Sequence, residues 1–400
     1  MTTTRTTLRE LLHIPGGGRY ALSAVVEAAT SGMLRPFVVI YAVFIGLSAP
    51  QAGLTLTVGM LVGLGAVPLT GRWIDAGAWR APSVAALLVR AVGMLFLVLL
   101  PGFSGFAIGA LLVGVGTQVA PPANAALVAA LAGPVHRTAA LAASRSLRNA
   151  GLGAGALLAT VLVAGGPGVL RWLALVTALG CAFGAAVIAR IPLPHRVPAA
   201  APGGGNPSGG GLRAVTVLAL AGIPYAFFAD VLEIALPLVL VQRLHAAPAW
   251  SSAIFVGNTV LVIALQVVVV VRLARWPSRT VLAGSGVLLA LSYLGFWLGA
   301  AAGGGPGTVI VALVAVPFTL GEILYTGSSV PLVIESAPPH LVGRALARWH
   351  LSYGLARAAD PIVITALLSL GAAALWVPLV AATLLGAAVV ARSGFSGYSS

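Results

Sequence analysis

The sequence predicts an all-α integral membrane protein with twelve transmembrane helices in two pseudo-symmetric six-helix halves. Three observations lead to this prediction: the composition, the spacing of apolar segments, and one central break rich in proline and glycine. Of the 400 residues, 59% are hydrophobic and only 8% are charged, whereas soluble domains carry about 25% charged residues. So few charges do not cover the surface of a soluble protein of this size.

Apolar segments long enough to span a membrane recur along the whole chain. A bilayer core of about 30 Å needs about 20 apolar residues in a helix, and short breaks with proline, glycine or arginine separate such segments here. The first follows an arginine-bearing N-terminus without a recognisable cleavage site, so we expect it to remain as an uncleaved insertion signal. The expected spans are residues 20–46, 50–71, 82–101, 103–131, 141–165, 170–190, 214–242, 249–272, 279–300, 306–334, 345–371 and 373–392.

The arginines predict how these spans are oriented. The chain has 22 arginines, no lysine and 8 carboxylates, for a net charge of +14. Basic residues are enriched in cytoplasmic loops, and this bias is met when both termini are cytoplasmic in a multi-pass protein of the cell membrane. Arg171 and Arg243 then fall outside. The arginines of the cytoplasmic side are Arg5, Arg9, Arg19, Arg72, Arg80, Arg137, Arg190, Arg196, Arg213, Arg272, Arg275, Arg279, Arg344, Arg348 and Arg392.

The longest break divides the chain into two halves. Residues 191–213 read IPLPHRVPAAAPGGGNPSGGGLR, a composition typical of a flexible linker. We expect an N-terminal six-helix half (1–190), this cytoplasmic linker, and a C-terminal six-helix half (214–400). Pro36 and Pro237 lie midway through the first span of each half, 201 residues apart, which supports two parallel repeats.

Four local patterns carry a family resemblance. They are SGMLRPFVVIYAVFIGLSAPQAGL (31–54), GRWIDAGAWR (71–80), RNAGLGAGALLA (148–159) and LGEILYTGSSVPLVIESAPPHLVGRA (320–345). With the six-plus-six organisation, they resemble the major facilitator superfamily over essentially the whole chain, and within it the 12-span drug:proton antiporter branch. The fifth-span pattern departs from that branch because it lacks the usual proline.

The resemblance implies a secondary active transporter, not an enzyme, that works by alternating access between its halves. The implied task is proton-coupled efflux of a small hydrophobic compound, such as a drug or natural product, by a monomer in the lipid bilayer. We expect no cofactor. ATP is not expected, because a phosphate-binding loop needs a lysine and the chain has none. Nucleic acid is not expected, because the arginines are spread along apolar segments rather than clustered with aromatic residues.

Carboxylates within the spans are candidates for proton coupling, since an embedded charge costs about 2.5–3.5 kcal/mol on insertion scales. Asp230 and Glu233 are three residues apart and are expected on one helix face, where two carboxylates do not both ionise easily. Glu27 lies eight residues before Arg35, on roughly the same face, and Glu322 stands alone in span ten. The alternative is that each acid pairs with an arginine of another span and only holds the bundle together.

Polar and aromatic residues within the spans are candidates to line a central substrate cavity, because mixed walls of this kind suit an apolar or weakly polar ligand. They are Arg35, Tyr41, Arg90, Gln118, Asn124, Arg148, Asn149, Tyr225, Asn258, Gln266 and Tyr325.

Other charged residues are assigned to gating or to structure. By the resemblance, Asp75 and Arg80 belong to a cytoplasmic gate that pairs with the end of a neighbouring helix in one state and releases it in the other. Arg357 and Asp360 are three residues apart and are expected to form a local ion pair, beside the helix irregularity that Pro361 creates.

Several alternatives remain open at the level of sequence. An importer of a sugar or organic anion in the same superfamily would use Arg35, Arg90 or Arg148 as an anion clamp. A membrane enzyme acting on lipid or glycan, a channel and a non-transporting sensor are rivals from other classes. Cys181 is the one cysteine, which excludes an internal disulfide, and the six histidines lack metal-ligand spacing.

Overall fold

The protein is helical wherever its structure is described, as the sequence predicts. The computed structural model describes residues 13–100, 102–163, 168–192, 212–247, 249–273 and 275–392. Every regular element in these ranges is a helix, which confirms the all-α class. Residues 193–211 of the expected linker lie outside the described residues, and the division into halves at 191–213 stays a prediction.

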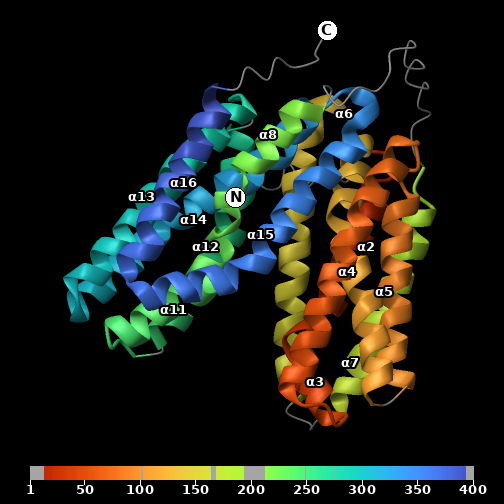
Figure 1. Cartoon of the computed structure of the whole chain (residues 1–400). Coiled ribbons are helices and arrows are strands. Elements are labelled where there is room, and N and C mark those ends of the chain that lie inside the picture. Colours follow the sequence, from red (N-terminus) through yellow and green to blue (C-terminus); the bar gives the residue numbers. More distant parts are fainter. Residues whose placement is uncertain are drawn as a thin grey trace. The chain divides into compact units, whose positions relative to one another are not determined.

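Two compact units make up the chain. Unit 1 comprises Met1–Gly205 and Pro339–His350, and unit 2 comprises Asn206–Pro338 and Leu351–Ser400. The helices of unit 1 before residue 205 are α2 (Gly17–Leu34), η1 (Arg35–Phe37), α3 (Val38–Phe44), α4 (Ala49–Asp75), α5 (Ala81–Leu99), α6 (Phe103–Val163) and α7 (Val169–Ala189) (Figure 1).

The second part of the chain starts with a broken helix. The elements from residue 213 on are α8 (Arg213–Ala221), α9 (Ile223–Ala226), α10 (Phe228–Asp230), η3 (Val231–Ala235), α11 (Leu236–Leu238), η4 (Val239–Arg243), α12 (Ala249–Leu273), α13 (Ser278–Ala302), α14 (Gly304–Glu335), η5 (Pro339–Leu341), α15 (Val342–Leu370) and α16 (Ala372–Arg392). Both η3 and η4 are π-helical. The expected seventh span is therefore a helix whose hydrogen-bond register changes several times.

Among the described residues, nine helices are long and apolar enough to cross a membrane. This number is consistent with twelve spans, because the remaining three expected spans have identifiable irregularities. The first is divided between α2 and α3 by the 3₁₀ turn η1. The eighth corresponds to α12, whose apolar stretch Ala253–Gln266 is short. The fifth is continuous with the fourth in the long helix α6.

Gly133 separates the expected fourth and fifth spans within α6. Its backbone has φ 66° and ψ −179°, a conformation that glycine adopts without the steric cost of a Cβ atom. The two straight parts of α6 thus meet at a kink rather than at a loop.

Unit 1 is held together by closely packed helices. Helix α2 packs against α6 and α7, and α5 packs against the same two helices (Figure 1). At the contact of α5 with α6, a Cβ atom at Gly93 would lie 2.9 Å from the Gly109 carbonyl oxygen. Small residues permit this approach of two backbones, and the resulting van der Waals packing contributes to helix association in lipid.

The core of unit 2 is aromatic. Tyr293 and Phe296 on α13 contact Phe318 on α14 and Trp376 on α16, with ring centroids 5.5–6.1 Å apart. These tilted and stacked contacts hold α14 and α16 against α13.

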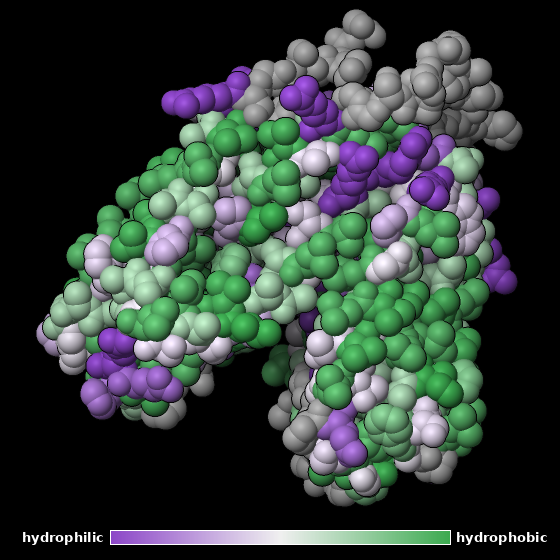
Figure 2. All heavy atoms as spheres, viewed as in Figure 1, coloured by the Kyte–Doolittle hydropathy of each residue, from purple (hydrophilic) through white to green (hydrophobic). Residues whose placement is uncertain are grey.

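The outer surface matches a lipid environment. Hydrophobic residues cover the flanks of the helices, whereas hydrophilic residues gather mainly near helix ends (Figure 2). Large apolar side chains such as Leu157, Leu179 and Leu313 are 66–73% exposed. Such exposure is unfavourable in water and neutral in a bilayer.

We expect Gly155→Ala to destabilise the protein and Gly153→Ala to leave it unchanged or slightly stabilised. A Cβ atom at Gly155 would overlap the carbonyl oxygen of Ala29 on α2, whereas one at Gly153 meets no atom within 4 Å. The expected loss for Gly155→Ala is about 1–3 kcal/mol, against a gain of up to about 1 kcal/mol in helix propensity for Gly153→Ala. Thermal unfolding of the purified variants in detergent measures both, and equal melting temperatures would contradict the packing described.

Candidate functional site

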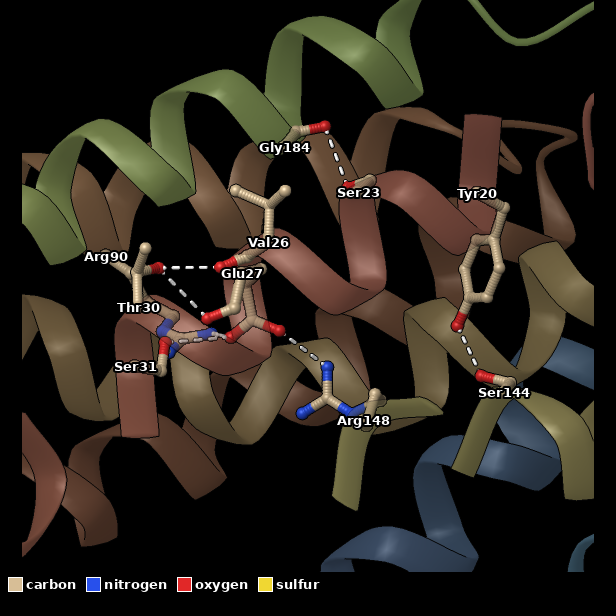
Figure 3. A network of polar contacts seen from close by, with 10 residues as sticks. All are labelled: Tyr20, Ser23, Val26, Glu27, Thr30, Ser31, Arg90, Ser144, Arg148 and Gly184. Atoms are coloured by element: carbon tan, nitrogen blue, oxygen red, sulfur yellow. Dashed lines mark hydrogen bonds and ion pairs between the residues drawn. The ribbon is translucent and has the colours of Figure 1, made fainter. Parts of the chain in front are cut away.

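Glu27 is the centre of a polar network that joins three helices of unit 1 (Figure 3). Its Oε1 accepts hydrogen bonds from Nη1 of Arg90 on α5 and from Oγ of Ser31, one turn along α2, at 3.1 Å. Its Oε2 accepts from Nη1 of Arg148 on α6 at 2.8 Å. Arg90 also donates from Nη2 to the Ser31 Oγ at 2.7 Å. Each carboxylate oxygen of Glu27 is thus bound to a different arginine.

Burial distinguishes the two arginines. Glu27 is 3% exposed and Arg90 is 7% exposed, whereas the side chain of Arg148 is 31% exposed. The two guanidinium groups and one carboxylate leave the cluster with one excess positive charge. A buried charge needs a partner of opposite sign, so the network satisfies Glu27 in full and its arginines only in part.

Close packing of α2 against α6 places Arg148 beside Glu27. A Cβ atom at Gly151 would lie 2.8 Å from the Cβ of Ala28, so a larger residue does not fit at this contact. Helix α7 fixes the other side of α2, since Thr177 Oγ1 donates to the Thr30 carbonyl oxygen at 2.7 Å. The position of the carboxylate is therefore set by two helix contacts.

A second charged cluster lies in unit 2. Arg357 on α15 forms an ion pair with Asp230, with 3.1 Å between Nη1 and Oδ1, but the angle is not that of a hydrogen bond. The carboxyl group of Asp360, which is 0% exposed, interacts with that of Asp230 and with the charge of Arg357. The expected local pair of Arg357 with Asp360 is thus replaced by a cluster of two acids and one arginine.

Two further expected placements are wrong. Asp230 is buried and Glu233 is exposed, because the intervening backbone enters the π-helix η3 and the wider turn moves Glu233 to another face. Glu27 is buried and Arg35 is exposed, because eight residues of α-helix turn about 80° beyond two full turns and so place the two side chains on different faces. Sequence spacing assumed a regular α-helix after Asp230, and it neglected the rotation over eight residues between Glu27 and Arg35.

Glu322 on α14 accepts a hydrogen bond from a side-chain amide. Nδ2 of Asn258 on α12 donates to Glu322 Oε2 at 2.9 Å and to Thr319 Oγ1 at 3.0 Å. Asn258, named as a cavity candidate, thus supports this carboxylate.

The other cavity candidates are mostly packing residues. Tyr41 is buried and donates to the Leu97 carbonyl oxygen at 2.8 Å, and Tyr225 stacks on Tyr325 with centroids 5.3 Å apart. Gln266 is buried, with no hydrogen-bond partner for its Oε1 among the described residues. The half-buried candidates are Gln118, Asn124 and Asn149. That any of them binds substrate stays a prediction.

Asp75 binds the N-terminus of α15. Its Oδ1 accepts from the Gly343 N–H at 2.6 Å, and its Oδ2 accepts from the N–H of Arg344 at 3.2 Å and from the Arg344 Nε at 2.8 Å. These N–H groups have no partner within the helix, and the positive end of the helix dipole favours a carboxylate there. A gating role for Asp75 stays a prediction.

Arg80 caps a different helix. Its Nη1 donates to the carbonyl oxygens of Ala189 at 3.2 Å and Ile191 at 2.7 Å, and Arg19 donates to the Arg190 carbonyl oxygen at 2.7 Å. The two arginines therefore satisfy the free carbonyls after α7. In this structure Arg80 and Asp75 bind different partners.

Three interactions were not predicted from the sequence. They are the Asp230–Asp360 contact, the Ser31 bridge between Glu27 and Arg90, and the Arg344 partner of Asp75. Two of them join residues of separate helices, and the third uses one serine among many. None leaves a recognisable residue spacing in the sequence. In the described part of the chain no three metal-ligating residues gather.

The family is settled by comparison with known sequences. The model of the Major Facilitator Superfamily matches residues 20–359. The chain belongs to the major facilitator superfamily. It is therefore a membrane transporter of small molecules, as the sequence patterns predicted, whereas the drug:proton antiporter branch is not resolved by this match. No curated protein sequence matches the chain.

Solved structures of other major facilitator proteins share the fold. The human organic anion transporter MFSD10 (TETRAN) has a TM-score of 0.75 at 18% identity and covers 96% of this chain and 99% of its own. A bacterial homologue of the iron transporter ferroportin has a TM-score of 0.75 at 17% identity, over 93% of this chain and 98% of its own. FucP, the fucose:proton symporter of E. coli, has a TM-score of 0.71 at 15% identity, over 96% of this chain and 100% of its own.

We expect Asp75→Ala to destabilise this major facilitator protein more than Arg344→Gln does. Asp75→Ala removes all three interactions at the start of α15, at a cost of about 1–2 kcal/mol. Arg344→Gln removes only the ion pair of a side chain that is 41% exposed, worth below about 1 kcal/mol. Thermal unfolding in detergent measures the order, and a larger loss for Arg344→Gln would show that the ion pair, not the helix cap, fixes Asp75.

Proposed function

We propose that this chain is a proton-coupled secondary transporter that exports a small, largely hydrophobic compound. In this proposal it acts as a monomer in the cell membrane, with both termini in the cytoplasm. The coarser function, transport by a major facilitator protein, follows from the family match. The observation that supports proton coupling most strongly is the Asp230–Asp360–Arg357 cluster in unit 2.

The cluster has a charge imbalance that one proton removes. Two ionised carboxylates and one guanidinium carry a net charge of −1, which is costly inside a membrane. The Oδ2 of Asp230 and both carboxylate oxygens of Asp360 are buried, with no hydrogen-bond donor among the described residues. A proton shared between the acids supplies the missing donor and neutralises the cluster. Its uptake and release therefore change the charge of unit 2.

Both helices are irregular at this cluster. Asp230 is the last residue of α10, directly before the π-helix η3, and Asp360 precedes Pro361, which leaves the Arg357 carbonyl without a helical donor. Broken helices at mid-span are typical of transporter binding sites. Irregular backbone of this kind suits a segment that moves when its charge changes.

The other carboxylates rank below this pair. Glu27 is already neutralised by Arg90 and Arg148, and Glu322 accepts an amide hydrogen bond from Asn258. We therefore rank both below the pair of Asp230 and Asp360, where two carboxyl groups interact. In an alternating-access cycle, the Asp75 contact with α15 would break and re-form as the transporter changes state.

Resemblance to the drug:proton antiporter branch supports export over import. The alternative, uptake of a sugar or organic anion, differs in the direction in which protons and substrate move. Liposomes that contain the purified protein and a pH-sensitive dye distinguish the two. Under an inward proton gradient, a loaded compound leaves if the protein is an antiporter, and an external compound accumulates if it is a symporter.

We expect Asp360→Asn to abolish compound-driven proton flux while the protein still binds the compound. This substitution keeps the Arg357–Asp230 ion pair and leaves the cluster neutral without a proton, so no proton is exchanged. Asp230→Asn should have the same effect on coupling, with a greater loss of stability because Asp230 forms the ion pair. The measurement is the dye signal after each compound of a hydrophobic panel is added to liposomes.

Glu233→Gln is the matched control, because Glu233 is an exposed acid on the same broken helix. We expect it to retain proton flux. Flux that survives in Asp360→Asn would refute the acid pair as the proton site. Loss of flux in Glu233→Gln alone would instead favour the pairing of Asp230 with Glu233 that residue spacing suggests.

A further inference from the structure

The Glu27 cluster of unit 1, which consists of Glu27, Arg90 and Arg148, has two positive charges and only one negative charge. Arg90 and Arg148 both bind Glu27, and among the described residues Tyr20 on α2 and Cys181 on α7 are further titratable groups that face the cluster. A tyrosine and a cysteine do not ordinarily supply a negative charge at neutral pH. One positive charge is therefore left without a full partner inside the membrane, where such a charge is costly.

From this geometry we infer that Arg148 binds an ionised carboxylate on the transported compound, in exchange for Glu27. The substrate is then an amphipathic organic anion, with a hydrophobic body and one carboxylate. This inference rests on the proposed transport function and adds the charge of its substrate. A bound carboxylate brings the cluster of Glu27, Arg90 and Arg148 to zero net charge.

Arg148, rather than Arg90, is the residue that can exchange its partner. Arg90 is held by two partners, Glu27 and Ser31, and its chain is enclosed, since a Cβ atom at Gly116 would overlap its Cγ. Among the described residues, Arg148 has Glu27 as its hydrogen-bond partner, through one nitrogen. Its side chain is 31% exposed, against 9% for that of Arg90, so Arg148 is the more accessible of the two arginines.

A carboxylate of the substrate fits the Arg148 guanidinium, because the carboxylate of Glu27 already binds there. Glu27 Oε2 lies 2.8 Å from the Arg148 Nη1, the distance of a charge-assisted hydrogen bond. A guanidinium has five N–H donors in a planar fork, and a carboxylate of the substrate can accept two of them. Glu27 itself stays bound through Oε1 to Arg90 and Ser31 when it leaves Arg148, so the exchange leaves no buried carboxylate unpaired.

The test measures binding of matched probes to the full-length protein purified in detergent. The probes are 2-naphthoate and octanoate, with their neutral amides and inorganic phosphate for comparison, titrated by calorimetry up to millimolar concentration. Wild-type protein should bind a carboxylate and not its amide or phosphate. Arg148→Gln should weaken this binding about ten- to hundredfold, the range for a charge-assisted hydrogen bond.

Substitutions at Glu27 distinguish exchange from simple attraction. Glu27→Gln removes the internal competitor and should tighten carboxylate binding about fivefold. If Glu27→Gln does not fold, Glu27→Asp replaces it in the test. Glu27→Asp keeps the charge but shortens the reach to Arg148, so it should also tighten carboxylate binding. The matched control is Arg145→Gln, which removes an exposed arginine one turn earlier on α6 and should leave binding unchanged.

Three results would overturn the inference: neither carboxylate binds to wild type or to the Glu27 variants, the amides bind as tightly as the acids, or Arg145→Gln weakens binding as much as Arg148→Gln. Because these titrations need no proton gradient, they are independent of coupling through Asp230 and Asp360. A protein that binds carboxylates but moves no protons would refute the proposed coupling and support the Arg148 site.

Discussion

A charge placed inside a lipid bilayer persists only beside a partner that offsets the loss of water. This constraint governs the structure, because so few charges occur in the chain and several lie within helices that cross the membrane. Glu27 is bound by arginines of two other helices, and Asp230 by an arginine of α15. The pairings join helices far apart in sequence, so they hold each unit together as well as lower the cost of the charges.

The two clusters are opposite in composition. In unit 1, one acid is shared by two arginines, and in unit 2, one arginine is shared by two acids. The first has an excess of one positive charge and the second an excess of one negative charge. An anion relieves the first imbalance and a proton relieves the second. In the proposed function, a transporter that carries an organic anion and a proton has a chemical partner for each cluster.

Small residues make this arrangement possible. Gly151 and Gly155 bring α6 against α2 closely enough for Arg148 to reach Glu27, and Gly116 leaves room for the chain of Arg90. The cytoplasmic-gate candidates depend on helix ends instead. Asp75 uses the free N–H groups at the start of α15, whereas Arg80 uses the free carbonyls at the end of α7. Close backbone contact and unsatisfied helix ends thus position the charged groups of unit 1 described above.

The sequence by itself determined the class of the protein, because hydrophobic length and scarcity of charge in a chain of 400 residues are compatible only with a helical membrane protein. It also predicted which charges lie within the spans. Tertiary structure alone decided their partners. Asp230 meets Asp360 rather than Glu233, and Glu27 meets Arg90 and Arg148 rather than Arg35. Spacing along one regular helix predicts neighbours on that helix, whereas the π-helical turn after Asp230 rotates a face and the packing of separate helices brings distant residues together.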